Sequence, residues 1–240
     1  FGLFWLLVLG IAYRRRFNRS FWVKPVAWLF YGTFLVAAVW YAPRNIPVKL
    51  ERFEPHQAAP APLQADRWWQ QDWQTMPARR NEFDDDQRWP LDVQVAGPLA
   101  PLQARLESQG WRMQPQAGWE QALLMLDQDT GPEALPVLPA TLDTQVESLL
   151  MVRDGERPDE RHVLRLWPAT KVLQPGDVPL WLGSAQTLRF TRHFEWIGMW
   201  HPLRGIDPAM AAVKASVDGL PMQEGVHPGS GLPVLRLRTE

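Results

Sequence analysis

Four residues in the C-terminal part of the chain have side chains that suit acid–base chemistry. They are His193, Glu195, His201 and Asp207, and they follow one another closely in the sequence. Imidazole and carboxylate groups move protons near neutral pH, and both also bind charged ligands. The stretch is predicted to cover the end of a strand, a loop and the start of a helix, so the four side chains could gather at one strand end. We take them as candidate ligand-binding residues, and ordinary loop polarity explains them equally well.

No catalytic or metal-binding motif supports these residues. The chain has five His and no Cys, and it contains no HExxH, no GxSxG, no Walker A loop and no GxGxxG after a strand. The run His227-Pro-Gly-Ser-Gly231 is predicted to be a tight turn before the last strand. We therefore expect no metal and no cofactor and assign no catalytic residue, and we leave open whether the domain is an enzyme.

Three arginines form the other candidate feature. Arg165, Arg236 and Arg238 alternate with apolar residues on predicted strands, which places them on the sheet face opposite the core. One interpretation is a basic strip for anionic headgroups or a phosphorylated lipid carrier, with Arg165 as a ligand-binding candidate. The other is an ordinary solvated strand face. A net charge of −1 gives no reason to expect nucleic acid as a partner.

The elements that must position these residues are predicted from periodicity and turn signals. We expect an α+β domain with a largely antiparallel sheet and about three helices. Gly183 is predicted to mark a bulge or a close backbone approach, and Pro168 to end a strand. The expected strands are 91–95, 111–113, 148–152, 162–167, 179–184, 194–200 and 233–238, and the expected helices are 98–109, 119–126 and 207–217.

A short helix over 66–76, capped by Asp66, is predicted to precede this sheet. It would place Trp69 and Trp73 one turn apart on a single face. We expect the two rings to dock on the domain, and a position in the headgroup layer of a membrane is the alternative.

A membrane span is predicted from Phe21 to Ala42. The run is apolar after Lys24 and carries Trp and Tyr near its ends, and about twenty apolar residues cross the ~30 Å hydrocarbon layer as a helix. A buried helix of a large soluble core is the alternative. Phe1 to Ala12 is interpreted as the end of a truncated first span, joined by an arginine-rich loop that we expect in the cytoplasm.

These patterns predict a division of the chain and a location. Residues 1–42 would form the two spans with their cytoplasmic loop, 43–65 a proline- and alanine-rich linker, and 66–240 one domain outside the cytoplasm. The expected location is the cell inner membrane, as a multi-pass protein. The lipid bilayer is then one expected partner.

Several segments together resemble the C-terminal domain of LssY. The pairing of LRLWPA at 164–169 with PLWLGS at 179–184 is the more specific signal, and the others are WWQQDWQTMPARR at 68–80, WPLDVQVAG at 89–97, LQARLESQGWR at 102–112 and LPVLP at 135–139. Such domains are found after a type 2 phosphatidic acid phosphatase membrane domain, and often after a DedA-like one. The resemblance implies an upstream phosphatase domain in the same chain, and it carries over no catalytic residue.

The sequence thus predicts a non-catalytic, membrane-anchored accessory or recognition domain in the bacterial envelope. It would serve an upstream domain acting on lipid phosphates or polyprenyl diphosphates, with an anionic lipid or a polyprenyl phosphate as ligand. Two other classes stay open. One is a hydrolase of envelope lipid or glycan that uses its own His, Asp and Glu residues. The other is a docking platform that binds envelope or secretion proteins through exposed Trp.

Overall fold

The computed structural model describes two compact units, Phe1–Glu54 and Pro55–Glu240. The residues described are 28–29, 31–40, 61–80, 90–118, 121, 123–127, 129–143, 145–193, 197–203 and 208–239. In chain order the elements of the second unit are β1 (Ala61–Gln64), α3 (Ala65–Gln70), η1 (Asp72–Thr75), β2 (Val93–Ala96), α4 (Leu99–Ser108), β3 (Arg112–Met113), η2 (Leu124–Leu126), η3 (Pro132–Ala134), β4 (Thr141–Leu142), β5 (Gln145–Val146), β6 (Leu149–Asp154), β7 (Glu160–Gln174), β8 (Val178–His193), β9 (Ile197–Pro202), α6 (Pro208–Ser216), β10 (Met222–Val226) and β11 (Pro233–Arg238).

The first unit is described over part of the predicted span. Residues 28–29 and 31–40 are helical, and their side chains are exposed. Within the stretches that the structure describes, no helix combines the length and the apolar character needed to cross a bilayer. The rest of Phe1–Ala42 lies outside the described residues, so the two spans and their orientation stay predictions.

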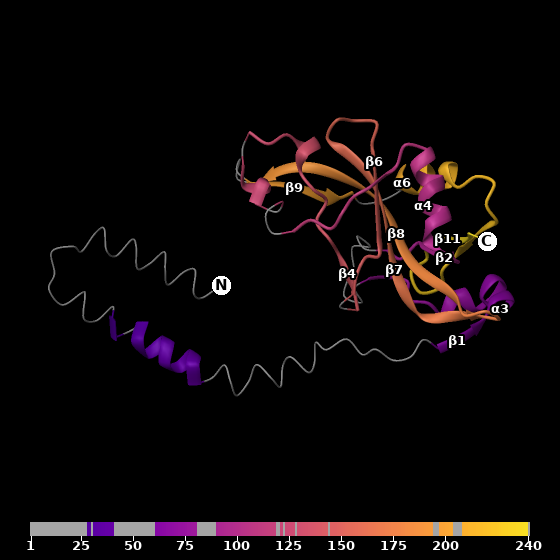
Figure 1. Ribbon diagram of the computed structural model, residues 1–240, viewed down its shortest axis with the longest axis horizontal. Helices are drawn as coiled ribbons and strands as arrows, with labels where there is room; N and C mark the ends of the chain where they lie inside the picture. The colour runs from indigo at the N-terminus through magenta and orange to yellow at the C-terminus, as the bar shows by residue number, and fades with distance from the viewer. Residues whose placement is uncertain are drawn as a thin grey trace. The chain divides into compact units, whose positions relative to one another are not determined.

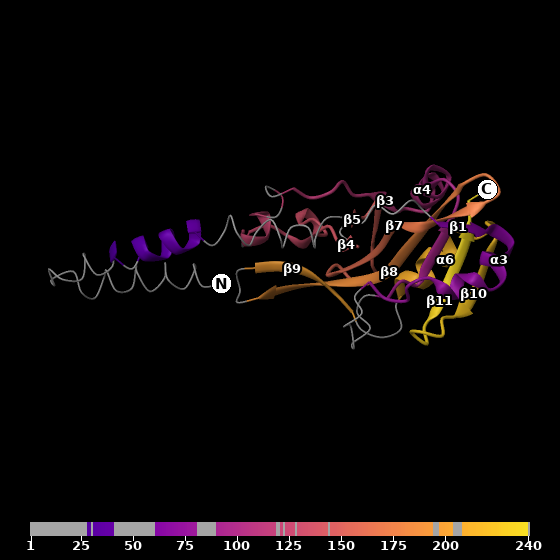
Figure 2. The same ribbon diagram turned by 90° about the horizontal axis from the view of Figure 1, so that it is seen from below.

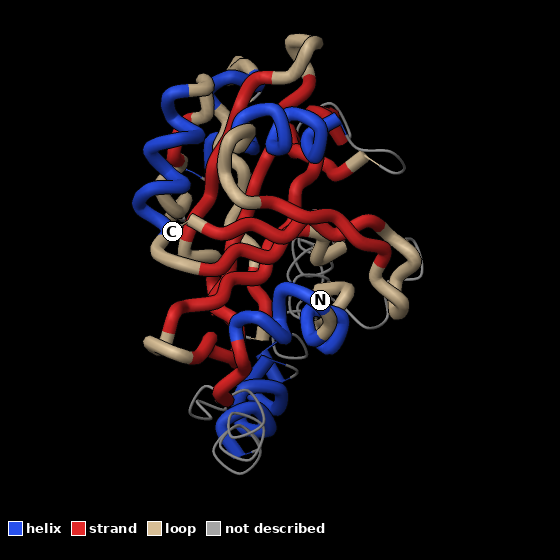
Figure 3. The backbone as a smooth tube through the Cα atoms, turned by 90° about the vertical axis from the view of Figure 1, so that its right-hand side faces the viewer, coloured by secondary structure: helices blue, strands red, loops and turns tan. Residues whose placement is uncertain are grey.

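A nine-stranded sheet forms the centre of the second unit. Its order is β10-β11-β2-β8-β7-β6-β3, with β1 added to β7 and β9 to β8. Only the β1–β7 and β11–β2 pairs among these are parallel. Figure 3 shows the strands making up most of the domain with helices outside them. The predicted α+β class with a largely antiparallel sheet is therefore confirmed.

Strands β7 and β8 form one long hairpin that the other strands join. In Figure 1 and Figure 2 this hairpin runs from the end near β9 to the end near β1 and α3. The prediction that Pro168 ends its strand is wrong, because β7 continues to Gln174. The register shifts between Pro168 and Val172, and such an irregularity accommodates a residue that has no N–H to donate.

One face of the sheet packs on α4 and α6. Leu102 and Leu106 of α4 and Val213 of α6 are fully buried against apolar residues of β2, β6, β7, β8 and β11. Gly183 of β8 lies beneath this core, where an added Cβ would come within 2.7 Å of the carbonyl oxygen of Arg165. The predicted close backbone approach at Gly183 is therefore confirmed.

The opposite face is covered at one end by the Trp-rich segment of α3 and η1. Trp68 and Trp73 are buried there with Trp167. Gln94 of β2 bridges α3 and η1, because its side chain accepts from Trp68 Nε1 at 2.9 Å and donates to the Trp73 carbonyl at 3.0 Å. The predicted docking on the domain is confirmed for both rings, since Trp73 is buried and Trp69 packs half-buried against the same cluster. The predicted single helix is wrong, since it divides into α3 and η1, and the N-cap is Gln64 rather than Asp66.

Four strands were missing from the prediction, and two of them, β4 and β5, pair only with each other. The other two, β1 and β10, belong to the nine-stranded sheet. Residues 61–64, which we assigned to the linker, form β1 and pair with Lys171–Gln174 of β7. The run Met222–Val226 forms β10 at the sheet edge beside β11. Strands β1 and β10 are short and lack the apolar alternation of a half-buried strand, and most of their residues are exposed.

Replacement of Trp68 tests whether this segment is part of the folded domain. Trp68→Ala should lower the free energy of unfolding by about 3–5 kcal/mol, because loss of a fully buried indole leaves a cavity and deprives the side-chain oxygen of Gln94 of its donor. Urea denaturation provides the measurement, with the exposed Leu124→Ala as the control. Equal stability of the two variants would show that the Trp-rich segment is not part of the core.

Candidate functional site

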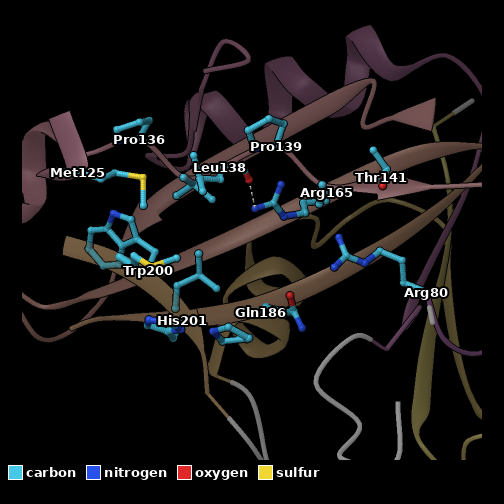
Figure 4. A pocket seen from close by; sticks show the side chains of 15 residues that line it. Arg80, Met125, Pro136, Leu138, Pro139, Thr141, Arg165, Gln186, Trp200 and His201 are labelled. Atoms are coloured by element: carbon cyan, nitrogen blue, oxygen red, sulfur yellow. Dashed lines mark hydrogen bonds between the residues drawn. The ribbon is translucent and has the colours of Figure 1, made fainter. Parts of the chain in front are cut away.

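A pocket of about 640 Å³ lies on the sheet face opposite α4 and α6. Strands β7, β8 and β9 supply its floor and one side, and the proline-rich strap of residues 132–140 crosses above them. Figure 4 shows Arg80, Thr141 and Arg165 around one end, and Met125, Trp200 and His201 at the other. The lining residues are Arg80, Met125, Pro136, Val137, Leu138, Pro139, Ala140, Thr141, Arg165, Gln186, Leu188, Met199, Trp200, His201 and Pro202.

Arg165 is the most constrained of these residues. Its Nη1 forms an ion pair with Glu147 at 2.6 Å, and its Nη2 donates to the carbonyl of Leu138 at 2.9 Å. Burial lowers the pKa of its guanidinium to about 10, and the nearby Arg80 acts in the same direction while Glu147 opposes it. The group remains protonated at neutral pH, so Arg165 places a fixed positive charge at this end of the pocket.

Both carboxylate oxygens of Glu147 accept hydrogen bonds from within the domain. Its side chain is fully buried, one oxygen accepts from Arg165, and the other accepts from the backbone N–H of Ala140 at 2.8 Å. A carboxylate whose two oxygens are both bonded in this way is poorly placed to abstract a proton from a ligand. Glu147 therefore joins Arg165 to the strap.

The strap is held by one row of side chains on β7. Residues at alternate positions of a strand share a face, and three of them donate to strap carbonyls. Arg161 donates to Leu135 at 3.0 Å, Arg165 to Leu138 at 2.9 Å, and Trp167 to Ala140 at 3.1 Å. The strap contains three prolines and forms no β-ladder with the sheet. The hydrogen bonds from β7 side chains therefore set the distance between the strap, which forms the roof of the pocket, and the sheet.

Two of the predicted candidates come together at the β8–β9 hairpin. His193 Nε2 lies 2.8 Å from His201 Nε2, and the two rings meet edge to face. Burial lowers the pKa of His201, and the charge of His193 lowers it further. His201 also lines the pocket that contains Arg165. The predicted candidates His201 and Arg165 therefore share one site.

The remaining two candidates, Glu195 and Asp207, lie outside the described residues. The predicted gathering of all four at a strand end is therefore tested only for the His pair. Among the residues that the structure describes, no group of three or more His, Cys, Asp or Glu is arranged to hold a metal ion.

The expectation for the three arginines needs correction. Arg236 and Arg238 do not continue a basic strip from Arg165, because the Trp-rich segment covers them. Arg236 lies 4.5 Å from the centre of a Trp73 ring and Arg238 the same distance from a Trp69 ring, and Arg236 is buried. The solvated-face interpretation is also wrong for Arg165 and Arg236. Stacking on Trp lets a buried guanidinium replace lost hydration.

Sequence reasoning missed Arg80, Gln186 and Ser184. Gln186 and Ser184 follow the alternation of β8 onto the same face as Arg165, and Ser184 pairs with Arg165 across the ladder. Had the strand been extended beyond Ser184, this alternation would have identified Gln186. Arg80 had no comparable signal, since its position depends on the path of the chain after η1.

The fold and the pocket define a class: an α+β domain with a ligand-sized pocket between its sheet and a strap. A family model described as LssY C-terminus matches residues 73–197. The chain belongs to this family. The match includes Arg80, Arg165, Gln186 and His193, and it ends before His201 and α6. Comparison with curated proteins and with solved structures gave no match.

The Arg165–Glu147 pair can be tested by replacing each partner and then both. Glu147→Leu or Arg165→Met alone should lower the free energy of unfolding by about 3–5 kcal/mol, because each leaves a buried charge without its partner. The double variant should recover most of this loss, because an apolar pair of similar volume leaves no uncompensated charge. Urea denaturation measures all three. Additive losses in the double variant would show that the two charges do not depend on each other.

The His pair makes a prediction for titration. A His pKa that is lowered on folding means that the unfolded chain binds the proton more readily. His201 should therefore reduce stability as the pH falls through its ordinary value of about 6.5, with no effect well above it. Titration followed by NMR should give a His201 pKa below that value. His193→Gln should raise the pKa of His201 only in part, because burial persists. A His201 that titrates at or above its ordinary pKa contradicts the geometry.

Proposed function

We propose that this domain is a non-catalytic recognition module that holds an anionic amphiphile in the pocket. The observation that carries the proposal is the polarity of the pocket. Its polar end, defined by Arg80, Thr141, Arg165 and Gln186, is continuous with an apolar end, defined by Met125, Leu188, Met199 and Trp200. A ligand with a charged head and an apolar chain matches both ends.

The charges at the polar end favour an anion. Arg80 and Arg165 both line the pocket, and among the described lining residues there is no acid. Glu147 pairs with Arg165, and Arg80 places a second guanidinium at the same end of the pocket. Burial is the main cause of the lowered pKa of Arg165, and the charge of Arg80 lowers that pKa further. A bound anion would relieve the repulsion between the two cations.

The size and the apolar end set limits on the ligand. Pockets for small molecules usually measure about 300–1,000 Å³ and are lined mainly by apolar groups with a few placed polar ones. A volume of about 640 Å³ holds a headgroup and the first part of a chain. The remainder of a long acyl or prenyl chain would extend outside. This arrangement suits a lipid whose tail stays in a membrane while its head is bound.

The polar groups support binding rather than turnover. Guanidinium and amide groups are hydrogen-bond donors that hold an anion without transferring a proton. Glu147 is committed to Arg165 and Ala140, and the partner of His201 is His193. A hydrolase would need a base beside a nucleophile or a metal. The His pair is the feature that keeps the hydrolase alternative open, and its member His201 lines the opposite end of the pocket from Arg80 (Figure 4).

The membrane setting of this proposal rests on the sequence and on the family. The predicted spans and linker would anchor the domain outside the cytoplasm at the inner membrane. The expected upstream phosphatase would then act on lipid phosphates or polyprenyl diphosphates, which are anionic amphiphiles. A docking platform built on exposed Trp has less support. Within the described part of 61–240, each Trp is buried or half-buried.

Binding of a short-chain lipid phosphate tests the proposal. The full chain should bind dioctanoyl phosphatidic acid and should bind dioctanoylglycerol, which lacks the phosphate, at least tenfold more weakly, since an ionic hydrogen bond contributes about 1.5–3 kcal/mol. Isothermal titration calorimetry gives both affinities. Arg80→Glu should abolish the preference.

Arg157→Glu is the matched control, because Arg157 is largely exposed and does not line the pocket. Equal affinity for the two lipids, or an effect of Arg157→Glu as large as that of Arg80→Glu, would contradict the proposal.

A further inference from the structure

The ring of Trp200 on β9 is held by three neighbouring groups. Its Nε1 donates to the carbonyl of Leu135 in the strap at 3.2 Å. The guanidinium of Arg161 on β7 lies 4.5 Å from the ring centre, and the ring of Phe190 on β8 meets it edge to face. Trp200 is half-buried and lines the apolar end of the pocket (Figure 4). The ring therefore presents an apolar surface of fixed position at that end.

Arg161 joins this ring to the strap. Its Nη1 donates to the carbonyl of Leu135 at 3.0 Å, and its Nη2 donates to the carbonyls of Glu133 at 3.0 Å and Pro132 at 3.2 Å. A carbonyl oxygen has two lone pairs, so that of Leu135 accepts from Arg161 and from Trp200 together. Arg161 is 6% exposed and does not line the pocket. It is therefore placed to act on a ligand through the residues that it holds.

Packing beside the ring restricts its movement. Gly198 precedes Trp200 by two positions on β9 and therefore shares its face. A Cβ added at Gly198 would come within 2.9 Å of the Leu135 side chain and of the Phe190 ring. Leu135 and Phe190 thus fill the space next to Trp200, and the position of the ring is set by the fold.

We infer that Trp200 recognises the apolar chain of the ligand and that Arg161 is its positioning residue. The inference rests on the proposed function and adds how the chain is selected. An aromatic ring offers a large, rigid apolar contact area. A side chain that is already ordered also loses little conformational entropy when a ligand binds. Affinity should therefore depend on chain length through Trp200, and on the phosphate through the opposite end of the pocket.

The competing explanation is that Arg161 only stabilises the domain, and Arg236 provides the control for it. Arg236 is 5% exposed and lies 4.5 Å from the centre of a Trp73 ring, and neither of these two residues lines the pocket. Arg161→Met and Arg236→Met each remove a buried guanidinium from a Trp ring. Only the ring beside Arg161 borders the pocket.

Butyl, hexyl and octyl phosphate and 1-hexanol are titrated into the full chain by calorimetry. In wild type each methylene that is buried should raise the affinity about fourfold. Hexyl phosphate should bind about tenfold or more tightly than 1-hexanol, which lacks the phosphate. Trp200→Ala should reduce the ratio of octyl to butyl phosphate affinity about tenfold or more, and it should leave the preference for hexyl phosphate over 1-hexanol unchanged.

Arg161→Met should reduce the same ratio about threefold or more, because the ring of Trp200 is no longer held. Trp200→Phe keeps an aromatic ring beside Arg161 and should retain most of the ratio. Arg236→Met should keep the wild-type ratio even where urea denaturation shows an equal loss of stability. A purely structural role of Arg161 would weaken all the alkyl phosphates alike and leave the ratio unchanged.

Three outcomes overturn the inference. If Trp200→Ala keeps the wild-type ratio, Trp200 does not recognise the chain, and a wild-type preference for hexyl phosphate still supports the proposed function. If Arg161→Met and Arg236→Met change the ratio equally, Arg161 is not a positioning residue. If wild type binds none of the four compounds, both the inference and the proposed function fail.

Discussion

The buried ion pair between Arg165 and Glu147 determines the geometry of the whole site. Two opposite charges removed from water stabilise a fold little in net terms, because their desolvation cost offsets most of their attraction. An arrangement of the chain that separates the two charges leaves a buried charge without a partner and strongly lowers the stability of the fold. The pair therefore favours the one arrangement in which Arg165 and Glu147 meet. Here it joins the centre of β7 to the strap through Leu138 and Ala140. The strap is thereby kept at a distance from the sheet that leaves the pocket open.

The two faces of the sheet differ in what covers them. One face buries apolar side chains against α4 and α6. The other is divided between the Trp-rich segment and the strap, with polar side chains from β2, β7, β8 and β11 between them. Gln94 hydrogen-bonds to Trp68 and Trp73 of the Trp-rich segment, and Arg236 stacks on Trp73. Arg165 and Gln186 instead border the pocket, which is why we propose the ligand site there.

Local patterns predicted the elements that depend on them. The helix that became α4, the strand β11, the turn after His227 and the close approach at Gly183 follow from apolar spacing and from glycine, and each is found. Strands β1 and β10 were missed because they pair through backbone groups alone and leave most side chains exposed, so their sequences carry no apolar alternation. The length of β7 was underestimated because an irregularity in the ladder accepts Pro168.

The candidate site was predictable only in part. The alternation on β7 placed Arg165 on the correct face, but it did not reveal that a strap covers that face. His193 and His201 were singled out for their closeness in sequence, and the β8–β9 hairpin brings their rings together. Arg80 reaches the pocket from a segment more than eighty positions before Arg165 in the sequence, and no local pattern encodes such a contact.

Hydrogen exchange at the strap tests the central claim most directly. The amide of Ala140 donates to Glu147, and the amide of Val137 donates to the side chain of Gln114 at 3.2 Å, so neither belongs to a regular ladder. If the Arg165–Glu147 pair holds the strap, the Ala140 amide should exchange slowly in wild type. It should exchange at least tenfold faster in Glu147→Gln, while amides in the centre of β8 keep their protection in both. Rapid exchange at Ala140 in wild type would contradict the claim that the ion pair fixes the roof of the pocket.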